Sequence, residues 1–192
     1  MMHIVLKSLK SIVDLDYPSD RYELIVVDNG STDGSFEEIK KFLKKRSSLR
    51  KKIIRLSKNL GFASGNNVGF MTRDRDGKYV LLLNNDAILF QEGLKTLVEY
   101  AENYSNVAGL QGVVLKYGTM FIDTAGDYID ELFNVYLAGE YHKYPWILRK
   151  SIYVTYTDGS CTLYRVESVL KCLGNKLFID EFSVMVMIMC LD

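Results

Sequence analysis

Two residues that could bind a ligand, Asp28 and Asn29, come directly after the apolar run 24–27. The run shows no alternation of polar and apolar residues, which is typical of a strand covered on both faces in a parallel α/β sheet. Ligands of such sheets bind beyond the carboxyl ends of the strands, where a carboxylate and an amide can hydrogen-bond a base or a sugar. We therefore predict a ligand site at Asp28 and Asn29. A plain turn is the alternative, because Asp-Gly and Ser-Thr turns are common after strands.

A second polar segment, residues 59–70, follows the run 52–56 and is crowded with glycines and amides. Asn59 and Asn67 offer hydrogen-bond donors and acceptors, and Gly61 allows a ligand to approach the backbone closely. The glycine spacing differs from that of a Walker A loop and from the dinucleotide fingerprint. The segment is therefore predicted to contribute to a ligand site, with a glycine-rich helix start as the alternative.

The third polar segment is Asn84, Asn85 and Asp86, directly after the apolar run 79–83. A hard divalent cation takes oxygen ligands and commonly uses only one or two protein carboxylates, leaving the rest to water and substrate phosphates. Asp86 suits that role, and the two asparagines could hold a sugar hydroxyl without adding charge. Taken alone, the segment is explained equally well by a turn. Three polar strand ends in one chain are far less expected by chance, so together they favour a ligand site.

The segments that must position these side chains alternate between helix and strand patterns. The elements predicted up to residue 100 are a helix at 5–15, a strand at 24–27, a helix at 35–46, a strand at 52–56, a helix at 65–73, a strand at 79–83 and a helix at 92–100. This alternation predicts an α/β fold, a mostly parallel sheet flanked by helices, in a single domain over 1–192. Residues 107–115 and 152–157 are predicted as further strands. Residues 117–144 hold aromatics and acids without a clear period, and we expect them to shape specificity.

Composition excludes several classes of protein. The 192 residues are 48% hydrophobic and 25% charged, which is ordinary for one globular domain. Lysine plus arginine number 24, as do aspartate plus glutamate, so no net charge favours nucleic acid as a partner. The cysteines share no metal-ligand spacing and are interpreted as reduced thiols. The longest apolar stretch, 182–191, is too short to span a bilayer, and 1–15 lacks the apolar core of a signal peptide. These features predict a cytoplasmic protein with no transmembrane segment.

The segments VVDNGSTDGS, NLGFASGNNVGF and LLLNNDA occur in the order and spacing of signatures of the inverting family 2 glycosyltransferases, and the chain resembles the rhamnosyltransferase-like branch. A later segment, DGSCTLYRVE, is similar to the family's segment beside the acceptor. The resemblance covers most of the chain and implies the GT-A fold. It also implies transfer of a sugar, rhamnose in that branch, from a nucleoside diphosphate sugar to a hydroxyl of a glycan, lipid-linked or other acceptor, with inversion. A position peripheral to the membrane is an alternative to a purely cytoplasmic one.

The resemblance assigns roles to the three polar segments. The first implies that Asp28 and Asn29 bind the nucleobase and ribose. The second implies that three residues line the nucleotide site: Asn59, Gly61 and Asn67. The third lies at the family's D-x-D position, with Asn84 in place of the first acid. It implies that Asp86 binds Mn²⁺ or Mg²⁺, beside Asn84 and Asn85, where the cation would stabilise charge on the leaving nucleotide.

Two departures from the family pattern concern the ends of the chain. Family members begin with an apolar strand that ends near Tyr-Asn, whereas this sequence begins at the helix that follows it. We therefore expect the family's first strand to be missing, which would leave unpaired peptide groups inside the sheet. After positions that match Asp180 and Glu181, the family carries an Asp that acts as general base. No match to that base is found in this sequence, so no catalytic residue is predicted.

The segment 183–192 stands where the family has its base motif. Each methionine in it must be encoded by ATG, and a shifted reading frame allows Tyr-Gly-Asp-Asp-Tyr-Val, which resembles that motif. We therefore predict that the frame slips near Phe182 and that 183–192 is out-of-frame peptide, with a hydrophobic strand or helix as the alternative. A chain incomplete at both ends would be an inactive transferase. The alternative function is a non-catalytic sugar-nucleotide-binding or interaction remnant.

Overall fold

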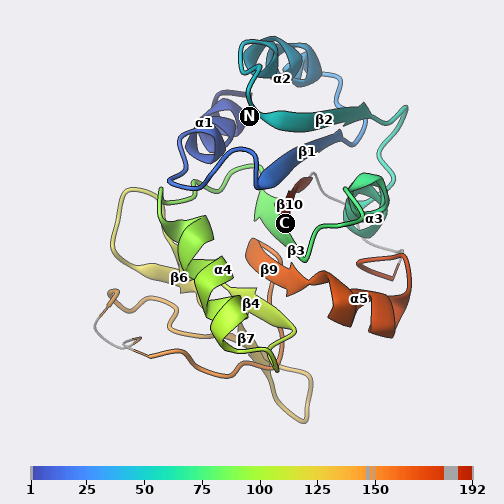
Figure 1. The fold of residues 1–192 in the computed structure, drawn as a ribbon. Helices are drawn as coiled ribbons and strands as arrows, with labels where there is room; N and C mark the ends of the chain where they lie inside the picture. The colour runs from blue at the N-terminus through green and yellow to red at the C-terminus, as the bar shows by residue number, and fades with distance from the viewer. Residues whose placement is uncertain (1, 146–147, 149, 180–185, 192) are drawn as a thin grey trace.

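The structure, a computed structural model, describes residues 2–145, 148, 150–179 and 186–191. A mixed sheet runs through the middle of the molecule, with helices on both faces and a lobe of short strands beside it (Figure 1). The elements are α1 Met2–Val13, β1 Tyr22–Asp28, α2 Ser35–Lys44, β2 Arg50–Arg55, α3 Phe62–Thr72, β3 Tyr79–Asn84, α4 Gly93–Asn103, β4 Gly109–Gln111, β5 Val114–Leu115, β6 Ile122–Thr124, β7 Asp127–Ile129, β8 Val135–Leu137, β9 Cys161–Arg165, α5 Val166–Leu173 and β10 Val186–Leu191. Among the described residues, no helix is long and apolar enough to cross a membrane.

The first hundred residues form the alternating helices and strands that their pattern predicts, so the α/β assignment is confirmed. The second half departs from the prediction. Residues 107–115 divide into the two short strands β4 and β5. Residues 152–157 do not form a strand, and only Tyr156 makes an isolated bridge, to Asp127. The prediction of a strand at 152–157 was therefore wrong, because its strand-favouring residues find no neighbouring strand to pair with over their length.

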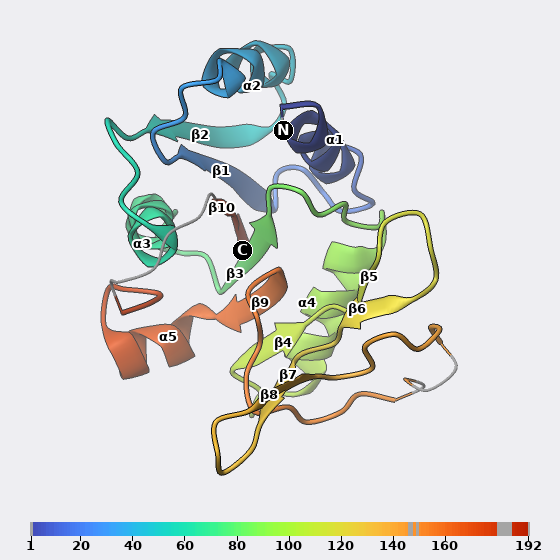
Figure 2. The same ribbon diagram turned by 180° about the vertical axis from the view of Figure 1, so that it is seen from behind.

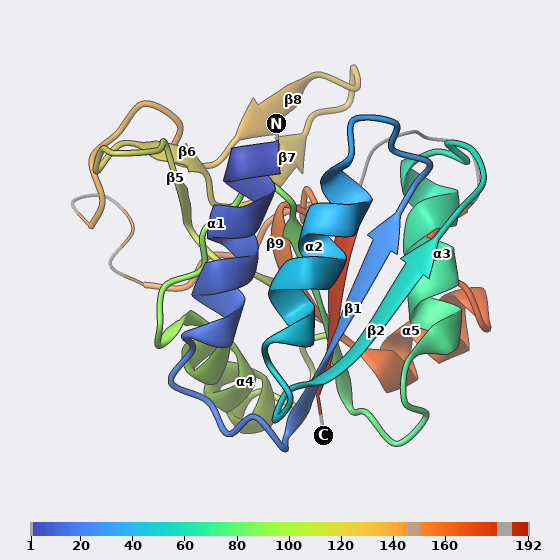
Figure 3. The same cartoon turned by 90° about the horizontal axis from the view of Figure 1, so that it is seen from above.

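Both faces of β1 are covered, which explains why its apolar run does not alternate. Leu24 and Val26 pack in one core cluster with buried residues of α1, α2 and α4. Ile25 and Val27 pack in a second cluster with residues of α3 and α5. Figure 3 shows the two groups of helices on opposite sides of the sheet. Burial on both faces is what an uninterrupted apolar strand requires.

The direction of the strands decides where the polar segments lie. The strand order is β2-β1-β10-β3-β9-β4. β1 and β2 pair in parallel, whereas β10 is antiparallel to β1 and β3, and β9 is antiparallel to β3 and β4. Thus β1, β2, β3 and β4 run in one direction and end at the same edge of the sheet. The two interleaved antiparallel strands make the sheet less parallel than the sequence pattern predicts.

Strand β10 lies in the interior of the sheet, between β1 and β3 (Figure 1). Its register pairs Leu191 with both Tyr22 and Tyr79. The expectation of unpaired peptide groups inside the sheet was therefore wrong at this position, because β10 pairs with both neighbours. Residues 186–191 form a hydrophobic strand. A hydrophobic strand or helix was the alternative to an out-of-frame peptide for this segment. The reading-frame hypothesis stays a prediction, and 180–185 and 192 lie outside the described residues.

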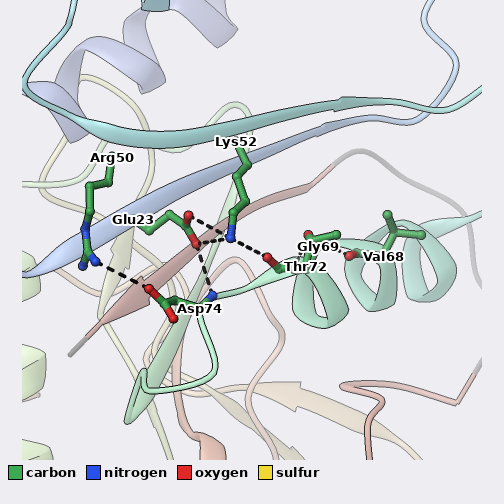
Figure 4. A network of polar contacts seen from close by, with 7 residues as sticks. All are labelled: Glu23, Arg50, Lys52, Val68, Gly69, Thr72 and Asp74. Carbon is green, nitrogen blue, oxygen red and sulfur yellow. Dashed lines mark hydrogen bonds and ion pairs between the residues drawn. The ribbon is translucent and has the colours of Figure 1, made fainter.

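A charged network joins β1 and β2 to the carboxyl end of α3 (Figure 4). The carboxylate of Glu23, whose side chain is 9% exposed, contacts Lys52 Nζ at 3.0 and 3.1 Å and accepts from the backbone N of Asp74 at 3.3 Å. Lys52 Nζ also donates to the carbonyl of Thr72 at 2.7 Å, in the last turn of α3. Arg50 in turn lies 3.6 Å from Asp74. The network therefore supplies partners to a nearly buried carboxylate and to a helix end.

We expect Glu23→Gln to lower the free energy of unfolding by about 1–2 kcal/mol, because Lys52 loses a nearly buried counter-charge. Lys52 is itself 42% exposed, so solvent screens part of the loss. Urea denaturation measures the difference. The matched control is Glu38→Gln, since Glu38 pairs with Lys41 at 3.8 Å on the surface of α2. Its effect should stay below about 0.5 kcal/mol, and equal effects of the two variants would contradict the role given to the network.

The described residues between 114 and 157 form a lobe of short strands beside the main sheet (Figure 2). In it β5 pairs with β6, and β7 pairs with β8. The lobe exposes large apolar side chains, with Leu132 81%, Phe133 86% and Tyr153 88% exposed. Its strands are two or three residues long, which is too short for a period to be visible in the sequence. The role of this lobe in specificity stays a prediction.

Candidate functional site

The three polar segments follow the ends of β1, β2 and β3 at one edge of the sheet. These strands end at Asp28, Arg55 and Asn84. Figure 3 shows the arrows of β1 and β2 ending together near α3. The third segment follows β3, which only β10 separates from β1. The structure therefore places the three segments along one edge, as the sequence predicts for strands that run in one direction.

Asp28 provides a buried carboxylate at this edge, at the end of β1. The residue is 2% exposed, and its Oδ1 accepts from the backbone N of Ser31 at 3.0 Å. Its Oδ2 lies 3.5 Å from Nε of Arg55 and accepts no hydrogen bond from the described residues. A carboxylate oxygen that is withdrawn from water without a hydrogen bond is unfavourable unless a ligand or water supplies a donor. Asp28 therefore has capacity left for a ligand.

Gly30 lets the loop after β1 lie against the loop after β2. Its φ is +83°, and a Cβ added to it would lie 2.6 Å from the carbonyl carbon of Lys58. A side chain at this position would push the two loops apart, so the close approach requires glycine.

Asn29 fastens the same two loops through its side-chain amide. Its Nδ2 donates to Oδ1 of Asn59 at 3.1 Å and to the carbonyl of Gly61 at 2.9 Å, and its Oδ1 accepts from the backbone N of Leu60 at 2.9 Å. Oδ1 of Asn59 also accepts from the backbone N of Gly61 at 2.9 Å. The predicted residues Asn29, Asn59 and Gly61 are therefore brought together. Both hydrogens of the Asn29 amide are used in this arrangement, so its main contribution is to hold the loop at 59–61 against Asp28.

Asn67 has a different set of partners. It is 3% exposed in α3, donates to the carbonyl of Phe178 at 2.8 Å, and accepts from the backbone N of Leu177 at 2.8 Å and of Phe178 at 2.9 Å. These contacts fasten segment 177–178 to α3. They place the Asn67 amide on that segment and not on the loops that Asn29 joins.

Asn84, Asn85 and Asp86 form the turn that follows β3. The backbone N of Ala87 donates to the carbonyl of Asn84 at 3.0 Å and closes the turn, while the backbone N of Asn84 donates to the carbonyl of Ser160 at 2.9 Å. Asp86 is exposed and the two asparagines are partly buried. The turn therefore presents one carboxylate and two amide groups beyond the strand end.

This set of oxygen donors fits Mn²⁺ or Mg²⁺ held partly by a substrate. No group of three or more His, Cys, Asp or Glu side chains that could hold a metal occurs in the part of the chain that the structure describes. A site closed by protein ligands, as for structural zinc, is therefore not formed there. Hard divalent cations that bind nucleotides need only one or two carboxylates, because water and phosphate oxygens complete the coordination. Asp86 meets that requirement.

A hollow of about 310 Å³ lies between the loops after β1 and β2. Its lining residues are Gly30, Ser31, Thr32, Arg55, Leu56 and Ser57. Arg55 was not predicted as a site residue. In the sequence it is a charged residue that directly follows Ile53 and Ile54, and the parallel register of β1 and β2 places it opposite Asp28.

Asp33 shapes the start of α2 at the rim of this loop. Its Oδ1 accepts from the Ser35 hydroxyl at 2.5 Å and from the Ser35 backbone N at 3.1 Å. The hydroxyl of Ser35, followed by its N–H, holds the pKa of Asp33 below its usual range. An ionised carboxylate here also suits the amino end of a helix.

No general base is assigned among the described residues, and the predicted family positions Asp180 and Glu181 lie outside them. The expectation that this chain carries no match to the family's general base therefore stays a prediction.

The comparisons with known proteins agree on one family. A family model described as "Glycosyl transferase family 2" matches residues 3–172. The poly(ribitol-phosphate) beta-N-acetylglucosaminyltransferase TarS of Staphylococcus aureus (strain Mu50) is 29% identical over 100 residues, which are 52% of this chain and 17% of that protein. The TarS of strain MW2 matches to the same extent.

Solved structures of similar shape include two transferases. The mannosyltransferase PcManGT from Pyrobaculum calidifontis, in complex with GDP-Man and Mn²⁺, has a TM-score of 0.65 at 18% identity, covering 91% of this chain and 44% of that chain. A Staphylococcus aureus TarS structure in complex with UDP has a TM-score of 0.56 at 23% identity, covering 87% of this chain and 44% of that chain. At these identities the similarity concerns the fold. The chain spans less than half the length of either solved chain.

Proposed function

Because this chain belongs to glycosyl transferase family 2 and has the GT-A fold, we propose that it binds a nucleoside diphosphate sugar at the edge formed by β1, β2 and β3. The observation that carries the proposal is that Asn29 joins the loop after β1 to the loop after β2. The hollow between these two loops lies next to the buried Asp28. Asp86 follows the next strand that runs in the same direction. A buried acceptor for a base or ribose, with an exposed carboxylate along the same edge, suits a nucleotide that carries a diphosphate.

The proposed roles follow from these positions. Asp28 accepts a hydrogen bond from the base or the ribose, and the loop at 59–61, fixed by Asn29, offers its backbone to the nucleotide. Asn67 acts indirectly, by fastening segment 177–178 to α3. Asp86, with Asn84 and Asn85 beside it, would hold Mn²⁺ or Mg²⁺. When bound, the cation offsets negative charge on the leaving diphosphate.

The proposed reaction is transfer of the sugar to a hydroxyl of a glycan, lipid-linked or other acceptor. We further propose that the transfer inverts the configuration at the sugar carbon, which requires in-line attack assisted by one general base. We also propose rhamnose as the transferred sugar, and the support for this is the sequence Asn84-Asn85-Asp86 at the D-x-D position. The similar proteins are named for N-acetylglucosamine and mannose. We propose a cytoplasmic location, with the membrane surface as the alternative.

Calorimetric titration tests the proposal. The panel is UDP-N-acetylglucosamine, GDP-mannose and dTDP-rhamnose, each with Mn²⁺ and with a chelator. We expect at least one donor to bind, and removal of the metal to weaken that binding on the order of tenfold, because the cation links the diphosphate to Asp86. Release of the nucleoside diphosphate, measured in parallel, separates turnover from binding alone. Failure of all three donors to bind would overturn the proposal.

We expect Asp28→Ala to weaken donor binding by about 1–3 kcal/mol both with Mn²⁺ and with a chelator, because it removes a buried hydrogen bond to the base or ribose. Calorimetry under the two conditions gives both values. Asp20→Ala is the control, since Asp20 is exposed in the turn before β1. A defect of Asp28→Ala that appears only with metal would contradict its placement at the base or ribose.

A further inference from the structure

The hairpin formed by β7 and β8 is apolar on both of its faces. Its cross-strand pairs include Tyr128 with Tyr136 and Ile129 with Val135. Because side chains alternate along a strand, these two pairs lie on opposite faces of the hairpin. The four side chains are 40%, 55%, 38% and 49% exposed in that order, so both faces reach solvent.

The tip of the hairpin is held in one conformation by Asp130. Its Oδ1 accepts from the backbone N of Leu132 and of Asn134, each at 2.9 Å, and its Oδ2 accepts from Asn134 Nδ2 at 2.9 Å and from the Tyr136 hydroxyl at 3.1 Å. Phe133 has a φ of +62°, in the left-handed region that a phenylalanine seldom adopts. Leu132 and Phe133, which are 81% and 86% exposed, therefore project from a tip whose shape is fixed by contacts within the hairpin.

The apolar area of this hairpin is larger than that of the patches on most monomers. Tyr153 adds to it, since it is 88% exposed and its carbonyl accepts from the Tyr128 hydroxyl at 2.8 Å. Together with the apolar residues of the hairpin named above, it exposes on the order of 900 Å² over both faces and the tip. The largest apolar patch of a typical monomer covers about 300–600 Å², and each partner of a standard interface buries about 800 Å². The hairpin therefore has an apolar area of the size that a stable protein–protein interface needs.

Strand β8 also has an open side. In an antiparallel pair, alternate residues direct their backbone groups away from the partner strand. On β7 these residues are Ile129 and Asp127, whose backbone N donates to the carbonyl of Tyr156 at 3.0 Å. The residues opposite them on β8 are Val135 and Leu137, and β8 has no second neighbouring strand in the described part of the chain. Figure 3 shows β8 at the outer margin of the molecule. Natural outer strands commonly carry charged residues or proline that prevent pairing, and the sequence of β8 has neither.

We propose that β8 pairs with β8 of a second copy of this chain, antiparallel across a twofold axis at Tyr136. In this register Val135 of each copy lies opposite Leu137 of the other, and the outward backbone groups pair across the axis. The antiparallel direction sets the two acidic tips, each with Asp130 and Glu131, at opposite ends, so that their like charges do not meet. The joined hairpins form four strands, which are more stable than two separate pairs. This inference does not depend on the proposed function.

Sedimentation velocity tests the inference on the full chain at about 1–100 µM, which covers the weaker affinities of interfaces of this size. We expect the chain to change from monomer to dimer as its concentration rises. Val135→Lys places a charge on the open side of each copy, so we expect it to weaken dimerisation about tenfold or more. Ile4→Lys is the matched control, because Ile4 is 47% exposed on α1, and it should leave dimerisation unchanged.

Phe133→Asn separates association from folding. Asparagine adopts the left-handed region more readily than phenylalanine, so the variant should unfold at no lower temperature while it loses apolar area at the tip. We expect weaker dimerisation of this folded variant, and it decides the test if Val135→Lys does not fold. A chain that stays monomeric, or equal weakening by Val135→Lys and Ile4→Lys, would overturn the inference. A monomer that sediments with phosphatidylcholine–phosphatidylglycerol vesicles would also overturn it, since a lipid surface would then cover the hairpin.

Tyr136→Cys tests the register. The two copies of this position would lie opposite each other with Cα atoms about 4.5 Å apart, which is within reach of a disulfide. The background is Cys172→Ser, because the Cys172 side chain is exposed. We expect oxidised glutathione to link two copies of Tyr136→Cys but not of Tyr128→Cys, since β7 lies one strand away from the axis. Equal linkage of the two variants would overturn the proposed register.

Discussion

Replacing Asp86 with alanine is expected to remove the Mn²⁺-dependent part of sugar-nucleotide binding. Asp86 is the carboxylate of the exposed turn after β3, and the described residues form no cluster of three or more metal-binding side chains that could replace it. Loss of supporting contacts around a metal typically weakens binding of the metal 10–100-fold, so we expect loss of a charged ligand to lower the affinity for Mn²⁺ about 100-fold or more. The roughly tenfold gain in sugar-nucleotide affinity that we expect from Mn²⁺ should disappear with it. Calorimetry with and without Mn²⁺ measures how much of the affinity for the sugar nucleotide depends on the metal.

Two further variants sharpen this test. Asp86→Asn keeps an oxygen ligand but removes the charge, and we expect it to retain less metal dependence than the unsubstituted chain. Asp76→Ala changes an exposed aspartate just before the amino end of β3, far along the strand from Asp86, and should have no effect. Equal affinity and equal metal dependence for Asp86→Ala and the unsubstituted chain would remove Asp86 from the site.

The second large effect is expected for Asn29→Ala. The substitution removes the two hydrogen bonds that the amide donates to Asn59 and Gly61 and the one that it accepts from Leu60. Buried groups left without partners cost about 1–3 kcal/mol each, and relaxation of the loop recovers some of this, so we expect the free energy of unfolding to fall by about 2–4 kcal/mol. The loop at 59–61 also loses its position next to Asp28. Nucleotide affinity should therefore fall together with stability.

Asn67→Ala provides the comparison that separates stability from binding. Asn67 is also a buried asparagine with backbone partners, but these belong to Leu177 and Phe178. We expect a similar loss of unfolding free energy, measured by urea denaturation, with little change in nucleotide affinity under conditions where the variant is folded. If Asn67→Ala weakens nucleotide binding as much as Asn29→Ala does, Asn67 itself lines the nucleotide site, as the family resemblance implies.

The sequence predicted those features that depend on neighbours close along the chain. The uninterrupted apolar run at 24–27 predicted a strand buried on both faces, and the core clusters on the two sides of β1 confirm it. The polar residues that follow three strand-like runs predicted a ligand site beyond the strand ends, and the structure places these segments at one edge because β1, β2 and β3 run in one direction. Spacing within a run and at its end was sufficient for both.

Features that depend on pairing across the chain could not be predicted in this way. The amide of Asn29 meets Asn59 and Gly61 only because β1 and β2 pair in a particular register. Arg55 reaches Asp28 for the same reason, and nothing within 52–56 indicates its partner. The side chain of Asn67 looked equivalent to those of the other amides, but α3 directs it to segment 177–178. The direction of β10 is likewise absent from its own apolar sequence, which suits a parallel or an antiparallel strand equally well.

The position of β10 has a consequence for how the protein reaches its native state. Its register joins Tyr22 to Leu191, residues far apart in the sequence, so the centre of the sheet closes only after a long-range encounter. Because the entropy of closing such a large loop is lost before the contacts form, this topology predicts slow folding. Until β10 arrives, β1 and β3 present open backbone edges that strands of other molecules can pair with. Refolding yield should therefore fall as protein concentration rises.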